Sequence, residues 1–187
     1  MGNIVRRFTV NIPTKTYLKK FLHRFYGDPI PLTYHNQIGI FILPLMERQN
    51  FTVNMVQSDI NSRMSFINDT IICKSALRNM GYKGHSINPD KIIAINRYFE
   101  NLFAEKLYIH CLKKTTPGQR NPGYDKAIID FTTVCSIDID IDISMDALKQ
   151  TEYRQRKEEE KILTSFVIPA GKYSTSTTAP HLSLIHI

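Results

Sequence analysis

Apolar residues recur at helical spacing near the start of the chain. Residues 15–26 place their apolar side chains along one side of a helix: Tyr17, Leu18, Phe21, Leu22 and Phe25. Thr14 precedes this stretch and is a candidate N-cap, and Gly27 follows it as a residue that commonly ends a helix. The pattern therefore predicts an amphipathic helix whose other side is polar and basic.

A second helical pattern begins at Asn88. This residue is a favourable N-cap, Pro89 suits the first helical position, and Asp90 complements the positive end of the helix dipole. The predicted buried stripe comprises Ile92, Ile95, Phe99, Leu102, Phe103 and Leu107. This is the clearest helix that the sequence predicts.

The last third of the chain predicts a pair of helices after a linker. Two Pro-Gly pairs mark residues 115–123 as the linker. Residues 124–135 and 145–163 have helical patterns, and Ser144 is a candidate cap for the second. Residues 136–143 alternate Ile with Asp or Ser, and the low β-propensity of Asp favours a connector over a strand.

Strands are predicted where β-branched and apolar residues run together, at residues 6–12, 51–56 and 63–67. Residues 34–48 are apolar on every side, which predicts a buried helix or strand, with a kink at Pro44 if it is a helix. Residues 70–80 predict a helix that ends at Gly81. The expected fold class is α+β, mainly α-helical with a few short strands and a C-terminal helical pair.

We expect two structured units and a tail. Residues 1–114 form a basic α+β and helical unit, residues 115–123 the linker, residues 124–168 a helical pair, and residues 169–187 a disordered tail. Residues 182–187 read LSLIHI, which is the in-frame translation of a common transposase sequencing adapter. We therefore expect this hexapeptide to be an artefact of sequence assembly, the natural C-terminus to be truncated, and the source to be microbial.

Charge is unevenly distributed along the chain. There are 24 Lys and Arg residues against 17 Asp and Glu residues, a formal net charge of +7. Residues 1–27 contain six basic residues and no acidic one, whereas acidic residues outnumber basic ones over residues 124–163. The sequence shows no secretory signal and no apolar run near the ~20 residues of a membrane span. Three cysteines indicate no disulfide framework, so we expect a cytoplasmic protein.

Basic residues supply the candidate nucleic-acid-binding site, because each cation that neutralises a phosphate releases counterions. The N-terminal candidates are Arg6, Arg7, Lys15, Lys19, Lys20 and Arg24. Residues 124–163 also have the outline of a helix-turn-helix, whose second helix supplies Lys149, Arg154 and Arg156. Two alternatives stay open. The second helix could be an ordinary solvated helix, because its four Glu residues repel phosphate. The N-terminal basic face could instead pack on the acidic C-terminal segment.

The remaining motifs are incomplete. Three aspartates resemble the start of a calcium loop, namely Asp138, Asp140 and Asp142. The Gly and Glu that such a loop needs are missing at the required spacing. Residues 81–84 read Gly-Tyr-Lys-Gly, which is similar to the GxxG loop of KH domains, although a turn between helices explains both glycines. We expect isolated cysteines to be buried hydrophobes, namely Cys73, Cys111 and Cys135.

The sequence contains no catalytic motif, and we expect no enzymatic activity, metal or cofactor. The charge pattern favours a small nucleic-acid-binding accessory or regulatory protein of a phage or mobile element, with DNA favoured over RNA. The alternative is a protein-interaction or assembly module that binds no nucleic acid. In that case residues 145–163 would associate with a protein partner or a second copy of the chain.

Overall fold

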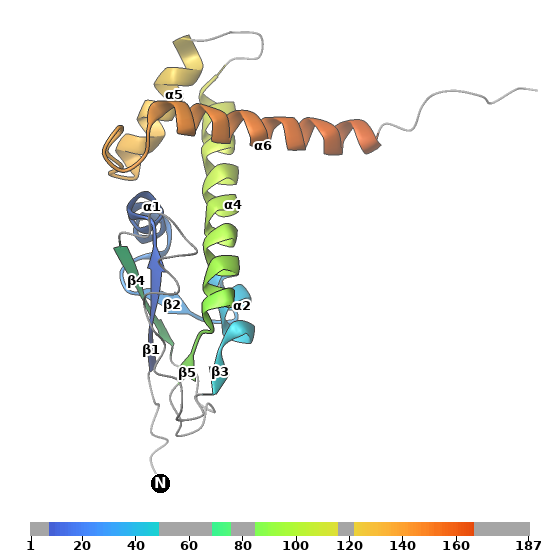
Figure 1. Ribbon diagram of the computed structural model, residues 1–187. Helices are drawn as coiled ribbons and strands as arrows, with labels where there is room; N and C mark the ends of the chain where they lie inside the picture. The colour runs from blue at the N-terminus through green and yellow to red at the C-terminus, as the bar shows by residue number, and fades with distance from the viewer. Residues whose placement is uncertain (1–7, 49–68, 76–84, 116–121, 167–187) are drawn as a thin grey trace, which may run out of the picture.

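One long helix organises the molecule. The computed structural model describes residues 8–48, 69–75, 85–115 and 122–166. Helix α4 (Pro89–Lys114) runs alongside a small sheet and helix α1 (Thr16–Tyr26), and its far end carries α5 (Pro122–Val134) and α6 (Met145–Phe166) (Figure 1). Helix α6 crosses α4 and continues away from the rest of the described chain. The expected α+β, mainly helical fold class is confirmed.

The main sheet has three strands in the order β1–β4–β2. Strand β1 (Phe8–Thr14) pairs antiparallel with β4 (Asp69–Ser75), and β2 (Ile30–Leu32) pairs parallel with β4. The helix predicted over residues 70–80 is wrong for Thr70–Ser75, which forms the central strand. Side chains along β4 alternate between buried and exposed, a period of two that packs Ile71 and Cys73 into the core. This segment forms a strand because it pairs with strands on both sides, and this pairing outweighs its local helical propensity.

Helix α1 begins one residue after the predicted position, and its N-terminus is not capped by Thr14. Lys15 occupies the N-cap position and makes no capping hydrogen bond with its side chain. The Thr14 hydroxyl, which is fully buried, instead donates to Asn96 Oδ1 on α4 at 2.7 Å. Gly27 ends the helix as predicted, at a φ of 87° that favours glycine.

The apolar segment after β2 divides into three short elements. Helix α2 (Gln37–Ile42) is capped by the Asn36 side chain, the 3₁₀ turn η1 (Leu43–Leu45) contains Pro44, and β3 (Glu47–Arg48) pairs with β5 (His85–Ser86). Gly39 packs directly on the backbone of Thr33, and a side chain at this position would clash with it. The α-helix ends at Ile42, and the 3₁₀ turn that contains Pro44 follows directly, with Leu43 still in the right-handed helical region.

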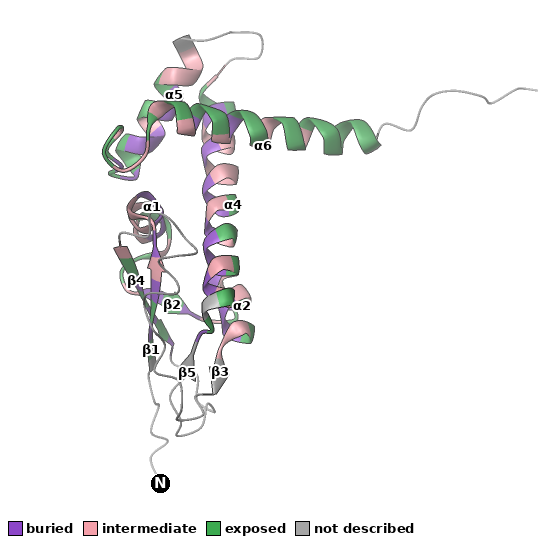
Figure 2. Cartoon of the chain, viewed as in Figure 1, coloured by how far each residue is buried: buried purple, intermediate pink, exposed green. Residues whose placement is uncertain are grey.

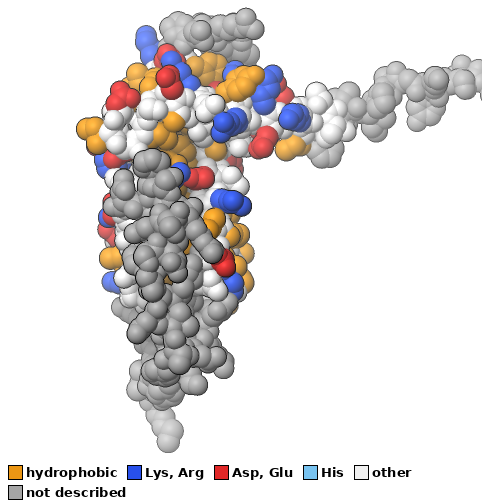
Figure 3. All heavy atoms as spheres, viewed as in Figure 1, with side chains coloured by type: hydrophobic (Ala, Val, Ile, Leu, Met, Phe, Trp, Pro, Cys, Tyr) orange, Lys and Arg blue, Asp and Glu red, His pale blue; other side chains and the backbone are white. Residues whose placement is uncertain are grey.

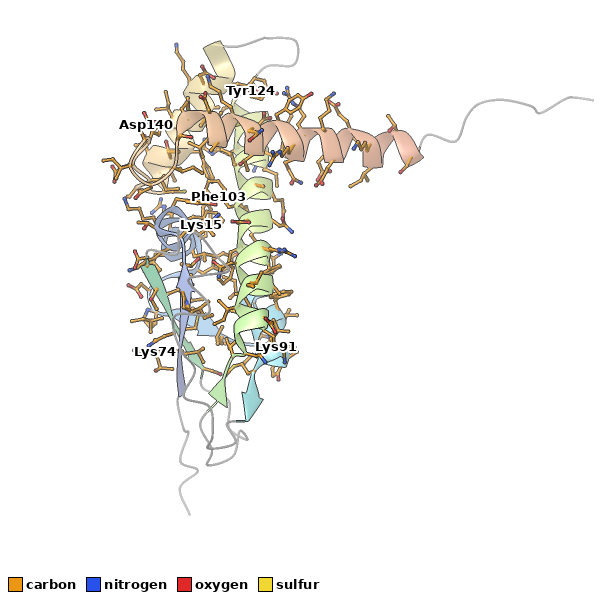
Figure 4. The ribbon with its side chains drawn as sticks, viewed as in Figure 1. Lys15, Lys74, Lys91, Phe103, Tyr124 and Asp140 are labelled. Carbon is orange, nitrogen blue, oxygen red and sulfur yellow. The ribbon has the colours of Figure 1, made fainter. Side chains whose placement is uncertain are left out.

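Helices α1, α4 and α5 meet in an aromatic core. The predicted stripe of α4 is buried throughout, and Phe103 contacts Phe21 of α1 and Phe131 of α5 with ring centroids 5.4 and 5.7 Å apart (Figure 4). One apolar cluster extends from Val10 on β1 to Leu148 on α6. The same cluster therefore includes residues from both predicted structured units.

The C-terminal helical pair has the predicted boundaries within a few residues. The backbone N–H of Ala147 donates to the Ser144 hydroxyl at 3.3 Å, which confirms the predicted cap of α6. The connector of residues 136–143 consists of turns, with Asp140 at a φ of 69° and a single bridge between Ile139 and Ile143. The strands expected at residues 51–56 and 63–67, the segment at residues 81–84 and the tail lie outside the described residues.

Candidate functional site

The lysines predicted to bind nucleic acid on α1 are engaged in ion pairs within the chain. Lys15 Nζ lies 2.6 Å from Glu100 Oε1 on α4, and Lys19 Nζ lies 2.7 Å from Asp69 Oδ1 on β4. Burial acts to raise the pKa of Asp69, but hydrogen bonds from Lys19 and the Thr70 backbone outweigh burial and hold it below its usual value. A phosphate at these lysines would compete with carboxylates that join this segment to its neighbours.

Lys20 connects α1 to the acidic connector before α6. Its ammonium donates to Asp138 Oδ2 and Asp142 Oδ2, both at 2.6 Å, and Asp142 Oδ2 also accepts the Asp138 backbone N–H at 2.9 Å. Hydrogen bonds to Asp138 and then Asp142 raise the pKa of Lys20. Here the basic face of α1 packs on the acidic C-terminal segment, which was one of the alternatives that the sequence left open. Figure 4 shows Asp140 in this connector, beside α1.

The predicted cations of α6 are only partly available. Lys149 Nζ lies 2.9 Å from Asp125 Oδ2 on α5. Arg156 lies 3.8 Å from Glu152, and its guanidinium stands over the Tyr124 ring at 5.2 Å from the centroid. Arg154 is exposed and makes no ion pair with a described residue.

Of the three remaining predicted basic residues, the structure describes Arg24. Arg24 on α1 is exposed and, within the part of the chain that the structure describes, forms no ion pair. Arg6 and Arg7 lie outside the described residues. Figure 3 shows basic and acidic side chains intermixed over the described surface in view. Among the described members of this set, the basic side chains are therefore interspersed with carboxylates, near α1 and on α6 alike.

Most of the net positive charge comes from residues outside the described part of the chain. The basic residues there are Arg6, Arg7, Arg63, Arg78, Lys83, Arg120 and Lys172. The same segments contain a single acidic residue, Asp59. These residues supply nearly all of the +7 excess, so the described part is close to neutral. The described residues alone therefore carry little of the net positive charge that attracts a protein to nucleic acid.

A cleft of about 460 Å³ lies in the angle between α4 and α6. Helix α4 contributes Tyr98, Asn101, Leu102 and Glu105, and α6 contributes Gln155, Glu158 and Glu159. On each helix the spacing is i, i+3, i+4, so each helix presents one face. We call this hollow the α4–α6 cleft.

The α4–α6 cleft is lined by one aromatic side chain, Tyr98, and by three carboxylates that form no ion pair with a described residue. The Tyr98 ring stacks on Phe41 with centroids 4.0 Å apart, and burial, then Tyr26 and Glu105, raise the pKa of its hydroxyl. Glu105, Glu158 and Glu159 make no ion pair within the described residues. Other described acids do form ion pairs, namely Asp28, Asp69, Glu100, Asp125, Asp130, Asp138, Asp142, Glu152 and Glu160.

The face of α6 that lines the cleft continues beyond it. Leu148, Gln155 and Ile162 recur every seven residues and so lie on the same side of the helix. Leu148 is buried against the body, whereas Ile162 is 49% exposed and the adjacent Leu163 is 65% exposed. Residues 161–165 are all exposed (Figure 2). The outer end of α6 therefore presents apolar side chains with no partner among the described residues.

The other side chains that could carry chemistry form no comparable site. All three cysteines are buried, as predicted, and burial raises the pKa of Cys73 and Cys111 to about 12 and of Cys135 to about 11. His110 Nε2 lies 2.8 Å from Asp130 Oδ2, which also pairs with Lys114 Nζ at 3.3 Å, so these three side chains join α4 to α5. The described residues contain no cluster of three potential metal ligands. Among their helices, none combines the length and the apolar composition that crossing a membrane requires.

Sequence reasoning missed the α4–α6 cleft because its walls come from helices far apart in the chain. Tyr98 and Glu105 read as the ordinary half-exposed side of a long helix, and Glu158 and Glu159 read as part of a solvated charge run. The available signal was the seven-residue recurrence of Leu148, Gln155 and Ile162. Comparison with models of protein families, with curated proteins and with solved structures found no match.

Proposed function

We propose that this protein is a protein-interaction module whose docking surface is the α4–α6 cleft and the outer end of α6. The observation that carries the proposal is the continuation of the packed face of α6 into exposed Ile162 and Leu163. Apolar side chains that extend a buried stripe beyond its own core are typical of a surface that a partner covers.

The intramolecular ion pairs favour this proposal over nucleic-acid binding. Lys15, Lys19 and Lys20 each hold a carboxylate of another element, and the described part of the chain is close to neutral. Nucleic-acid binding through Arg24 and Arg154, or through segments outside the described residues, stays a prediction. It is the competing outcome of the experiment below.

A display selection tests the docking surface directly. The probe is a library of random peptides with a helical bias, selected against the immobilised protein. The test variant is Ile162→Ser/Leu163→Ser, and the matched control is Ile129→Ser/Ile141→Ser, which alters two apolar side chains that are 47% and 83% exposed elsewhere. All four changes are at exposed positions, so each should alter the free energy of unfolding by no more than about 0.5 kcal/mol.

We expect peptides that bind the native protein and the control variant but lose binding to Ile162→Ser/Leu163→Ser. A selection that enriches no such peptide would contradict the proposal. Fluorescence anisotropy with duplex DNA, single-stranded DNA and RNA on the same proteins measures the competing function. Salt-sensitive binding that falls in Arg24→Ala/Arg154→Ala, together with an empty selection, would establish nucleic-acid binding in its place.

A further inference from the structure

We infer that the occupant of the α4–α6 cleft is a basic amphipathic helix of another protein. This inference rests on the proposed function and adds the chemistry of the partner. The cleft is lined by the Tyr98 ring, Leu102 and three carboxylates, and this lining suits a ligand with apolar and cationic side chains on one face. The geometry, the charge and the exposed end of α6 each support one part of that description.

The geometry favours a helical occupant. Tyr98, Leu102 and Glu105 lie on one face of α4, and the outer half of α6 leaves that face at a wide angle (Figure 1). Two helices that diverge from a crossing leave space that a third helix can fill by packing its ridges into their grooves. Helices bound in this way contact the groove with residues at i, i+3, i+4 and i+7. The cleft residues on α4 and α6 follow the same spacing.

The charge specifies a basic occupant. Glu105 comes from α4, while Glu158 and Glu159 come from α6, so the carboxylates stand on both walls of the cleft. Glu159 accepts a hydrogen bond from Gln155 at 3.2 Å, and none of the three forms an ion pair with a described residue. A Lys or Arg side chain of a partner would find carboxylates on both sides. An acidic helix would place like charges opposite each other, and a neutral helix would leave the three carboxylates without a cation.

The same charges argue against a second copy of this chain in the cleft. A symmetric contact through the outer half of α6 would bring Glu158 and Glu159 of both copies together, because symmetric dimers use the same patch on each subunit. The cations of this part of α6 lie to one side of these carboxylates. Lys157 already pairs with Glu160 at 2.8 Å. Arg154 and Lys161 stand four residues before and three residues after Glu158, on the side away from Glu159.

The exposed apolar residues at the end of α6 indicate how far along this helix a bound partner would pack. Ile162 follows Gln155 and Glu158 at the next positions of the same helical face, and Leu163 lies beside it. An occupant that packs along α6 would therefore meet carboxylates near α4 and apolar side chains farther out. This order predicts a partner helix with its cations toward α4 and its apolar residues toward the end of α6.

The experiment uses the strongest peptide from the selection and measures its affinity by fluorescence anisotropy at low and high NaCl. The test variant is Glu105→Gln/Glu158→Gln, which neutralises one carboxylate on each wall. The matched control is Asp140→Asn/Asp146→Asn, which removes the same charge from exposed carboxylates outside the cleft. We expect selected peptides with a net positive charge, and binding weakened about fivefold in the test variant and unchanged in the control. The weakening should be smaller at high NaCl.

Two results would overturn the inference while leaving the proposed function intact. The first is a selection that enriches neutral or acidic peptides, or peptides that bind the test and control variants equally. The second is a mass that rises with protein concentration and returns to that of a monomer in Ile162→Ser/Leu163→Ser, which would make a second copy the occupant. Failure to enrich any peptide that depends on Ile162 and Leu163 would instead contradict the proposed function itself.

Discussion

A buried asparagine joins the long helix to the sheet, and its removal should be costly. Asn96 is 1% exposed, and both its amide oxygen and its amide nitrogen form hydrogen bonds. Its Oδ1 accepts from the Thr14 hydroxyl at 2.7 Å, and its Nδ2 donates to the Pro13 carbonyl at 2.9 Å and the Ile92 carbonyl at 3.1 Å. Two of these three bonds connect α4 to β1.

Asn96→Ala would remove both connections and leave the fully buried Thr14 hydroxyl without an acceptor. Each lost hydrogen bond is worth about 1 kcal/mol, and a buried polar group left unpaired costs about 1–3 kcal/mol more. The expected loss in the free energy of unfolding is therefore about 3–5 kcal/mol. Thr14→Val removes one hydrogen bond and leaves the buried Asn96 Oδ1 without a donor, so by the same reasoning it should cost about 2–4 kcal/mol.

A double-mutant cycle tests the coupling between these two side chains. Urea unfolding followed by circular dichroism gives the free energy for the native protein, Asn96→Ala, Thr14→Val and the double variant. Each single variant leaves one buried polar atom of this pair without its partner, whereas the double variant has lost both atoms. The double variant should therefore be more stable than the sum of the two single changes predicts, by at least about 1 kcal/mol. Thr9→Val, at an exposed position of the same strand, is the control. Additivity within about 0.4 kcal/mol would refute the hydrogen bond as the source of the stabilisation.

Three further changes test other contacts by the same unfolding measurement. Gly39→Ala should destabilise by about 3 kcal/mol or more, because its methyl group would overlap the Thr33 backbone, and a loss below about 1 kcal/mol would contradict that packing. Lys20→Met should cost about 1–3 kcal/mol, since it leaves the Asp142 side chain, 5% exposed, without its cation; Lys20→Arg should restore part of that loss. Burial raises the pKa of Glu152, so its contribution to the free energy of unfolding is present below its usual pKa and is lost as the pH rises and the buried carboxyl ionises. Glu152→Leu should therefore stabilise the protein by about 1 kcal/mol at pH 7 and by less at pH 4.

The sequence predicted elements whose signals are local. The cap at Asn88, the apolar stripe of α4 and the cap at Ser144 each depend on a few neighbouring residues, and each appears in the structure. Asn88 Oδ1 accepts the Asp90 backbone N–H at 3.1 Å, as an N-cap should. Helix α1 was likewise predicted from its apolar spacing, with Phe25 the only member of its stripe left largely exposed, at 46%.

Errors occurred where a distant residue decides the outcome. Thr14 has the sequence position of a cap, but Asn96 lies close enough to compete for its hydroxyl, and nothing near Thr14 in the sequence reveals this. Residues 69–75 became a strand because β1 and β2 offer backbone partners on both sides. The α4–α6 cleft depends on the angle at which two helices cross, which is set by tertiary packing and not by either helix alone.

The carboxylates of this protein divide into those that hold the fold together and those that do not. Asp69, Glu100 and Asp142 bind lysines of α1, so their loss should lower stability. Glu105 and Glu158 share a cleft with Glu159 and have no described cation, so neutralising them should leave the free energy of unfolding unchanged or slightly raise it. A variant that keeps its stability and loses affinity for a basic helix separates docking from folding. An equal loss of both would place these carboxylates among the residues that maintain the fold.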